Sequence, residues 1–167
     1  VGEPDLKTEV FGAKMDMPIF LSPTAMQSLY HPDGDKASAR AAEKFGTIYS
    51  MSTMASFSIE EIANLSSGPK IFQLYIHKDQ SITDDLIDRC KRANFNGMCI
   101  TVDTIVAGNR ERDHRTGFTT PPKFTLDSLM SFAMRPQWVF NYFTNKKFEL
   151  ANLNDKVEKG TNIAQSV

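Results

Sequence analysis

The sequence is poor in cysteine, nearly balanced in charge and free of long hydrophobic runs, and each property excludes a class of protein. Two cysteines, Cys90 and Cys99, are too few for a disulfide framework, so we expect two buried thiols in a reducing cytoplasm. The formal net charge of -1 gives no basis for a nucleic-acid partner. Because no run reaches about 18 apolar residues, we expect no membrane-spanning helix.

The chain starts with Val-Gly-Glu-Pro, without an initiating methionine and without a signal-peptide pattern. We therefore expect a chain that begins within a longer protein. Its hydrophobic content of 41% and charged content of 23% are typical of a folded globular domain rather than a disordered chain.

Short apolar runs alternate with helical patterns along the first 104 residues. Strands are predicted at residues 18–22, 47–52, 70–75 and 97–102, with helices at 35–45, from a capping box at 58–61 to Gly68, and at 81–94. One helix between successive apolar strands indicates βα units in a parallel sheet that is covered on both faces. A doubly wound sheet and a closed (β/α)8 barrel both remain open. No Gly-x-Gly-x-x-Gly motif follows the first strand, which disfavours a dinucleotide-binding sheet.

Hydrogen-bonding residues follow or end all four predicted strands. They are Ser22 and Thr24, Ser50 and Ser52, Gln73 and Tyr75, and Thr101 and Asp103. In an α/β barrel these strand ends surround one mouth, where such side chains would suit a planar ligand with polar edges, such as an isoalloxazine ring. The competing interpretation is that serine and threonine at these places only cap the following helices.

The pattern changes after Thr104, and residues 105–167 are predicted to form an excursion from the repeated units. The basic loop at 108–115 is either an anion site or a solvated loop with local ion pairs. Residues 124–147 combine aromatic, apolar and basic side chains, which suits either a membrane interface or a lid packed on the barrel. Residues 148–167 are polar and show no periodicity.

A set of short motifs in order resembles the FMN-dependent 2-hydroxy-acid oxidase and dehydrogenase family. The motifs are Met-Pro-Ile (17–19), Ser-Pro-Thr-Ala-Met-Gln (22–27), His-Pro-Asp-Gly-Asp (31–35), Ala-Arg-Ala-Ala (39–42), Met-Ser-Thr (51–53), Ser-Ile-Glu-Glu (58–61), Phe-Gln-Leu-Tyr (72–75), Thr-Val-Asp-Thr (101–104) and Gly-Asn-Arg-Glu-Arg-Asp (108–113). The Arg-Pro-Gln-Trp segment at 135–138 is similar to the bacterial L-lactate dehydrogenases in particular.

The resemblance implies an α/β fold, a (β/α)8 barrel of which residues 1–167 form about the first half, with FMN as cofactor. It assigns cofactor contacts to Pro23, Thr24, Ala25, Ser52, Gln73 and Thr101. It assigns substrate and catalytic roles to Tyr75, which faces the substrate, to Asp103, which supports a histidine, and to Arg110, which lies near the substrate carboxylate. Met54 stands where glycolate oxidases often carry tryptophan, which leaves the preferred substrate side chain open. No metal ligand is predicted.

The implied reaction is oxidation of a small L-2-hydroxy acid, L-lactate in the first place, with electrons passed from FMN to quinone or another acceptor. An oxygen-using oxidase and a non-catalytic fragment are the alternatives. The three histidines lie outside the family's Ser/Asn-His-Gly-Gly-Arg motif, so residues 1–167 alone are expected neither to turn over substrate nor to hold FMN tightly. We further expect a homo-oligomer at full length, and a cytoplasmic location, or peripheral attachment to the inner face of the cell membrane through residues 124–147.

Overall fold

The computed structural model describes residues 2–103, 108–116, 126–145 and 149–153. Its centre is a parallel sheet of three strands in the order β3 (Tyr49–Ser52), β4 (Lys70–Tyr75) and β5 (Gly97–Thr101). Leu21 adds one parallel bridge to Tyr49 at the free side of β3. The predicted βα order and parallel pairing are therefore confirmed for these three strands.

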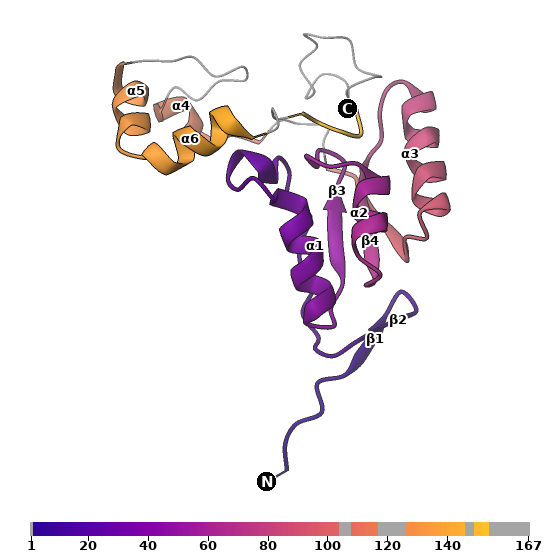
Figure 1. Cartoon of the computed structure of the whole chain (residues 1–167). Coiled ribbons are helices and arrows are strands. Elements are labelled where there is room, and N and C mark those ends of the chain that lie inside the picture. The colour runs from indigo at the N-terminus through magenta and orange to yellow at the C-terminus, as the bar shows by residue number, and fades with distance from the viewer. Residues whose placement is uncertain (1, 104–107, 117–125, 146–148, 154–167) are drawn as a thin grey trace.

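Three helices cover one face of the sheet: α1 (Gly34–Lys44), α2 (Ile59–Leu65) and α3 (Gln80–Arg92) (Figure 1). The ends of these helices follow local chemistry. Ser58 and Glu61 form the predicted capping box at the start of α2. Gly46 adopts a positive φ of 60° just after α1, a conformation that glycine reaches without steric cost.

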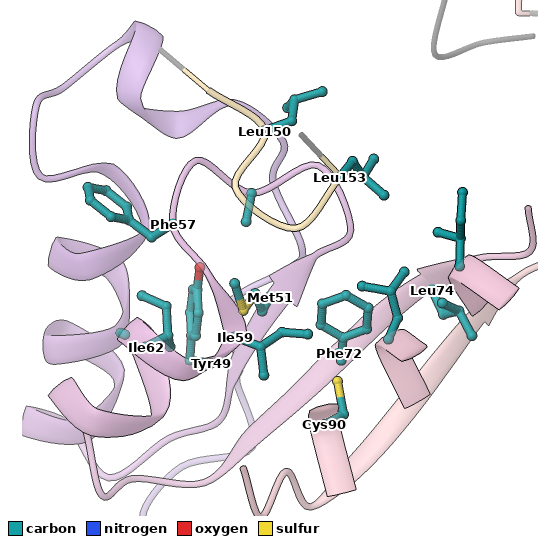
Figure 2. Close-up of a cluster of buried hydrophobic side chains, with 14 of the residues drawn as sticks. Tyr49, Met51, Phe57, Ile59, Ile62, Phe72, Leu74, Cys90, Leu150 and Leu153 are labelled. Atoms are coloured by element: carbon teal, nitrogen blue, oxygen red, sulfur yellow. The ribbon is translucent and has the colours of Figure 1, made fainter. Parts of the chain in front are cut away.

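The main core lies between this helical layer and the sheet (Figure 2). Strand residues Tyr49, Met51, Phe72 and Leu74 point into it. Side chains alternate along a strand, so Ser50, Ser52, Ile71, Gln73 and Tyr75 belong to the opposite face. That opposite face is the one on which a barrel of this type would place its interior.

A hairpin that the sequence analysis missed lies at the amino-terminal end of the sheet, where Figure 1 shows it far from α5 and α6. It pairs β1 (Thr8–Val10) with β2 (Ala13–Met15) through a turn at Phe11 and Gly12, both at positive φ. Ala13 and Met15 pack with Ile48 and Ile71 in a second, smaller core. The hairpin thereby covers one end of the sheet and leaves the carboxyl ends of the strands free.

The excursion contains α4 (Glu111–Thr116), α5 (Leu126–Ala133) and α6 (Pro136–Thr144). In Figure 1 the arrowhead of β3 points toward the end of the molecule where these helices lie. Trp138 ties α6 to the rest, because its Nε1–H donates to the carbonyl oxygen of Leu29, the last residue of the short helix η1 (Gln27–Leu29), at 2.8 Å. None of the helices in the described ranges is long and apolar enough to cross a membrane. Parts of the predicted segment 124–147, and residues 154–167, lie outside the described residues.

Two expectations are wrong. Residues 18–22 do not form a buried strand: Ile19 is 65% exposed and Phe20 43% exposed, because no described strand flanks them on the side away from β3. Cys99, expected to be a buried thiol, is exposed on the face of β5 away from the helices, whereas Cys90 is buried as expected. The segment 150–153, where the sequence shows no periodicity, contributes Leu150 and Leu153 to the main core, and Leu153 is only 2% exposed.

Candidate active site

Three of the predicted cofactor residues form one hydrogen-bonded row across the carboxyl ends of the three strands. Ser52 Oγ donates to Gln73 Oε1 at 3.2 Å, and Gln73 Nε2 donates to Thr101 Oγ1 at 2.7 Å. Gln73 is buried and therefore uses both ends of its amide, which fixes the orientation of that group. The row brings together residues that are 21 and 28 positions apart in sequence.

The predicted cofactor loop at Pro23, Thr24 and Ala25 lies beside the end of β3. The N–H of Met26 donates to the carbonyl oxygen of Met54 at 3.0 Å, which joins this loop to the loop that follows β3. Pro23 and Thr24 are exposed and Ala25 is half-buried. Backbone groups of this loop are thus accessible at the same end of the sheet as the hydrogen-bonded row.

Tyr75, Asp103 and Arg110 continue the chain at or beyond the strand ends. Tyr75 is half-buried at the end of β4 and pairs in register with Thr101. Asp103 and Arg110 are exposed, and the described residues link neither of them to Tyr75 by a hydrogen bond. The predicted basic loop at 108–115 is helical from Glu111 onward, in α4, and the exposed Arg115–Glu111 ion pair at 3.2 Å on this helix fits the interpretation of a solvated segment with local ion pairs. The structure therefore assembles the predicted cofactor residues more completely than the predicted catalytic ones.

A buried carboxylate that the sequence analysis did not single out supports the loop after β3. Asp35, in the first turn of α1, accepts hydrogen bonds from the Tyr49 hydroxyl and from the Ser56 N–H, each at 2.9 Å. Burial raises the pKa of Asp35, although these two hydrogen bonds oppose the shift. Asp35 thus fixes the loop containing Met54 from the side of the helical layer.

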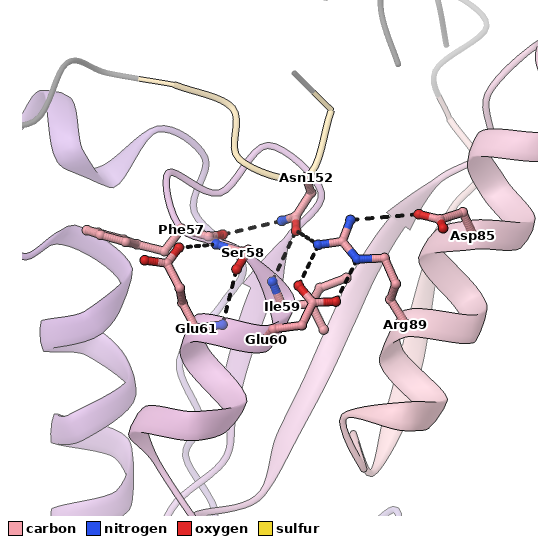
Figure 3. Close-up of polar contacts among 8 residues, drawn as sticks. All are labelled: Phe57, Ser58, Ile59, Glu60, Glu61, Asp85, Arg89 and Asn152. Carbon is pink, nitrogen blue, oxygen red and sulfur yellow. Dashed lines mark hydrogen bonds and ion pairs between the residues drawn. The ribbon is translucent and has the colours of Figure 1, made fainter. Parts of the chain in front are cut away.

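A second unpredicted cluster fixes the end of the excursion (Figure 3). Asn152 Oδ1 accepts from the Ile59 N–H at 3.1 Å and from Arg89 Nη2 at 3.0 Å. Its Nδ2 also donates to the Phe57 carbonyl oxygen at 3.4 Å. Arg89 in turn holds Glu60 through two hydrogen bonds of 2.7 Å, which lower the pKa of Glu60 to about 2. No local sequence signal marks Asn152, because its partners are more than 60 residues away.

A cavity of about 470 Å³ lies between α6 and the loops that precede α1 and α2. Trp138 and Tyr142 line it on one side, and His31 and Phe57 on the other. None of the predicted cofactor or catalytic residues contributes to its walls. The cavity is therefore separate from the strand-end row and marks the contact between excursion and barrel.

Comparisons with known proteins all point to one protein family. The family model described as FMN-dependent dehydrogenase matches residues 1–165. Glycolate oxidase 1 of Zea mays is 45% identical over 129 residues, which are 77% of this chain and 35% of that protein. The glycolate oxidase of Spinacia oleracea is 44% identical over 125 residues, 75% of this chain and 34% of its own. The chain thus spans about a third of the length of these curated relatives.

Solved structures give the same answer. A monotopic membrane protein, (S)-mandelate dehydrogenase, superposes with a TM-score of 0.85 at 28% identity, over 96% of this chain and 43% of that one. A mandelate oxidase variant that holds an FMN adduct has a TM-score of 0.65 at 38% identity, over 68% of this chain and 34% of that one. The predicted fold is confirmed: the described elements are the first part of a (β/α)8 barrel, and their strands form an open sheet.

Proposed function

Because the chain belongs to the FMN-dependent dehydrogenase family, whose cofactor is FMN, we propose that it builds the first half of an active site that oxidises a small L-2-hydroxy acid. The product is the 2-keto acid, and L-lactate is the substrate proposed first. The observation that supports this most directly is the row of Ser52, Gln73 and Thr101 across three strand ends.

The residues present fit a flavin ring. The row offers hydroxyl and amide groups that act as donors and acceptors, as the polar edge of an isoalloxazine requires. Ser50 Oγ, on the same face of β3, is buried and has no hydrogen-bond partner among the described residues, so this face retains unused hydrogen-bonding capacity. When bound, FMN would accept the two electrons of the oxidation, while the protein binds and orients the reactants.

The remaining predicted residues would act on the substrate. Tyr75, half-buried at the end of β4, would present its hydroxyl to the substrate, and the exposed Arg110 would bind the substrate carboxylate with two parallel hydrogen bonds. Asp103 would hold the histidine base of the completed site in the correct orientation. These three roles, like the cofactor contacts of Pro23, Thr24 and Ala25, are proposals taken from the family resemblance.

The electron acceptor distinguishes two candidate functions. A dehydrogenase that reduces quinone at a membrane is favoured by the apolar surface of α6 and of the turn before it, where Met134, Phe140 and Phe143 are each at least 67% exposed. The structural similarity to a monotopic membrane protein supports the same choice. An oxygen-using oxidase is favoured by the identity of 45% with a glycolate oxidase. We place the dehydrogenase first.

The test uses protein purified from its complete coding sequence. We expect bound FMN in the visible spectrum and L-lactate-dependent reduction of an artificial dye, with little oxygen consumption and no activity on D-lactate. Oxygen consumption that matches dye reduction would establish the oxidase instead. Colourless protein that stays inactive after FMN is added would refute both and favour a non-catalytic product.

A pair of variants tests the row itself. Gln73→Leu removes both hydrogen bonds at similar volume, so FMN affinity should fall about tenfold or more. Gln80→Leu changes an exposed glutamine on α3 and should leave FMN affinity unchanged. Equal FMN affinity in the two variants would contradict the proposed cofactor site.

Substrate preference is tested at Met54, which packs half-buried against the core beside the proposed cofactor loop. Met54→Trp narrows the pocket with a rigid ring in place of a flexible thioether. We expect kcat/KM to shift from L-lactate toward glycolate, measured with both acids. An unchanged ratio would show that Met54 does not line the substrate pocket.

A further inference from the structure

At the end of strand β3, a side-chain oxygen takes the place of a main-chain carbonyl oxygen as the acceptor of one hydrogen bond of the ladder. In the parallel ladder, Ser52 pairs with Gln73, so Thr53 would pair next with Leu74. Regular pairing then requires the Thr53 N–H to donate to the Gln73 carbonyl and the Tyr75 N–H to donate to the Thr53 carbonyl. The first bond is present at 3.0 Å. In place of the second, the Tyr75 N–H donates to Thr53 Oγ1 at 3.2 Å.

The same hydroxyl also binds the main chain of Gln73. Thr53 Oγ1 donates to the Gln73 carbonyl oxygen at 2.6 Å, and the Thr53 N–H lies 3.4 Å from Gln73 Oε1. Thr53 is completely buried, so water cannot take over these contacts. One side chain therefore holds the main chain of β4 at both Gln73 and Tyr75.

This exchange lets the main chain leave the sheet without loss of hydrogen bonds. After Thr53 the chain turns into the loop before α2, where the Met54 carbonyl accepts from the Met26 N–H at 3.0 Å. If the Thr53 carbonyl continued the ladder, Met54 would extend β3 instead of contacting the cofactor loop. The hydroxyl thus maintains the ladder and releases the loop at the same point.

We propose that Thr53 is a positioning residue of the active site, whose hydroxyl fixes Gln73 and Tyr75 relative to the loop at 23–26. The effect of Thr53 on FMN and substrate binding rests on the proposed function, which assigns Gln73 to FMN and Tyr75 to the substrate. The effect of Thr53 on the main chain of β4 rests only on its own hydrogen bonds.

Three variants separate this role from a general effect on folding. Thr53→Val removes the hydroxyl at nearly equal size, and Thr53→Ser retains it. Thr83→Val is the matched control, because Thr83 is also buried and its Oγ1 accepts a main-chain bond, from His77 at 3.1 Å. Hydrogen exchange at the Tyr75 amide is measured in the 167-residue chain. FMN affinity, KM for L-lactate and the thermal midpoint are measured in protein from the complete coding sequence.

In Thr53→Val we expect exchange of the Tyr75 amide to accelerate about tenfold or more, and FMN affinity to weaken by a similar factor. Thr53→Ser should return the exchange rate and the FMN affinity to those of the unsubstituted protein. Thr83→Val should change neither quantity, even if its thermal midpoint falls. The proposal would be overturned if the Tyr75 amide of Thr53→Val exchanged at the rate of the unsubstituted chain. It would also be overturned if Thr53→Ser did not return this rate to that of the unsubstituted chain. If the unsubstituted protein binds no FMN, the proposed function fails separately, and Tyr75 exchange alone decides the role of Thr53.

Discussion

The two cysteines show how strongly the environment of a single residue depends on the face it occupies. Cys90 lies in the core on α3, and burial raises the pKa of its thiol to about 12. Cys99 lies on β5, on the face away from the helices, and is exposed. The thiolate is the reactive form of cysteine, so the two thiols should differ widely in reactivity.

A thiol reagent added to the native chain at about pH 8 should therefore label Cys99 first, about tenfold faster or more than Cys90. The two sites are followed by mass spectrometry of peptides. Denaturant should equalise the two rates, which provides the control. Parallel labelling of both cysteines in the native chain would contradict the burial of Cys90.

The buried side chain of Asn152 should contribute strongly to stability. Asn152→Ala removes the oxygen that accepts hydrogen bonds from the Ile59 N–H and from Arg89. It also removes the amide group that donates to the Phe57 carbonyl oxygen. We expect a loss of about 1–3 kcal/mol in the free energy of unfolding, measured by urea denaturation. The control Asn64→Ala, on the exposed side of α2, should not destabilise the chain. Equal stability of both variants would refute the role of Asn152.

At the scale of elements, the start of α2 is a junction supported by both local and long-range contacts. Its capping box is local, but Asn152 and the Glu60–Arg89 pair link it to α3 and to the end of the excursion (Figure 3). The Glu60 side chain is half exposed, so solvent screens this pair and its main effect is a dependence of stability on pH.

The direction of that dependence follows from the lowered pKa. Glu60 has a pKa of about 2 in the folded chain and an ordinary value of 4.5. Its stabilising contribution is therefore complete above about pH 4.5 and is lost as the pH falls toward about 2. Urea midpoints of Glu60→Gln and the unsubstituted chain should differ at pH 7 and converge between these values. The control Glu9→Gln changes an exposed residue of β1 and should match the unsubstituted chain. A constant difference for Glu60→Gln would contradict the assignment.

The helices α5 and α6 carry the proposed membrane contact. Trp138 stacks between α5 and α6 on Phe132, with ring centroids 5.3 Å apart, and it is the only tryptophan of the sequence. With vesicles of phosphatidylcholine and phosphatidylglycerol, its emission should shift to shorter wavelength.

The matched variant replaces Phe140 and Phe143 by serine, since these rings are 67% and 79% exposed. We expect the emission shift and vesicle sedimentation to be lost in this variant. A second variant, Phe45→Ser, removes an exposed ring just after the carboxyl-terminal end of α1 and should bind vesicles normally. Vesicle binding that survives the loss of Phe140 and Phe143 would favour a lid packed on protein.

At the scale of the whole molecule, the described strands form an open sheet with apolar residues at both margins. Ile19 and Phe20 are exposed beside β3, while Ile100 and Val102 are exposed on and just after β5. Unpaired edges and exposed apolar surface favour association with further chain. The homo-oligomer expected at full length remains a prediction.

Catalysis by residues 1–167 alone should be absent. Neither His31 nor His77 lies in the strand-end row, and His77 is buried at 3% exposure beside α3. With FMN and L-lactate supplied, dye reduction by the purified chain should stay at background, and FMN should be lost on gel filtration. A chimera supplies the control: the 129 matched residues replace their counterparts in the Zea mays glycolate oxidase, and this protein should bind FMN. Turnover by the chain alone would refute the assignment of the catalytic base to a later segment.

The sequence by itself determined what depends on near neighbours and on residue type. The capping box at Ser58 and Glu61, the helix predicted over 35–45 and the order of the βα units from β3 to β5 follow from short-range chemistry, and all three are confirmed. The motifs likewise identified the family and FMN, because a motif is a property of the chain order.

Only the tertiary structure decided which of these residues meet. The row from Ser52 through Gln73 to Thr101, the double role of Thr53 and the contacts of Asn152 join residues between 20 and 95 positions apart. Exposure was decided in the same way: Cys99 and Ile19 have apolar sequence environments but lie where no described element packs on them. Burial depends on what the fold places opposite a side chain, and local sequence does not contain that information.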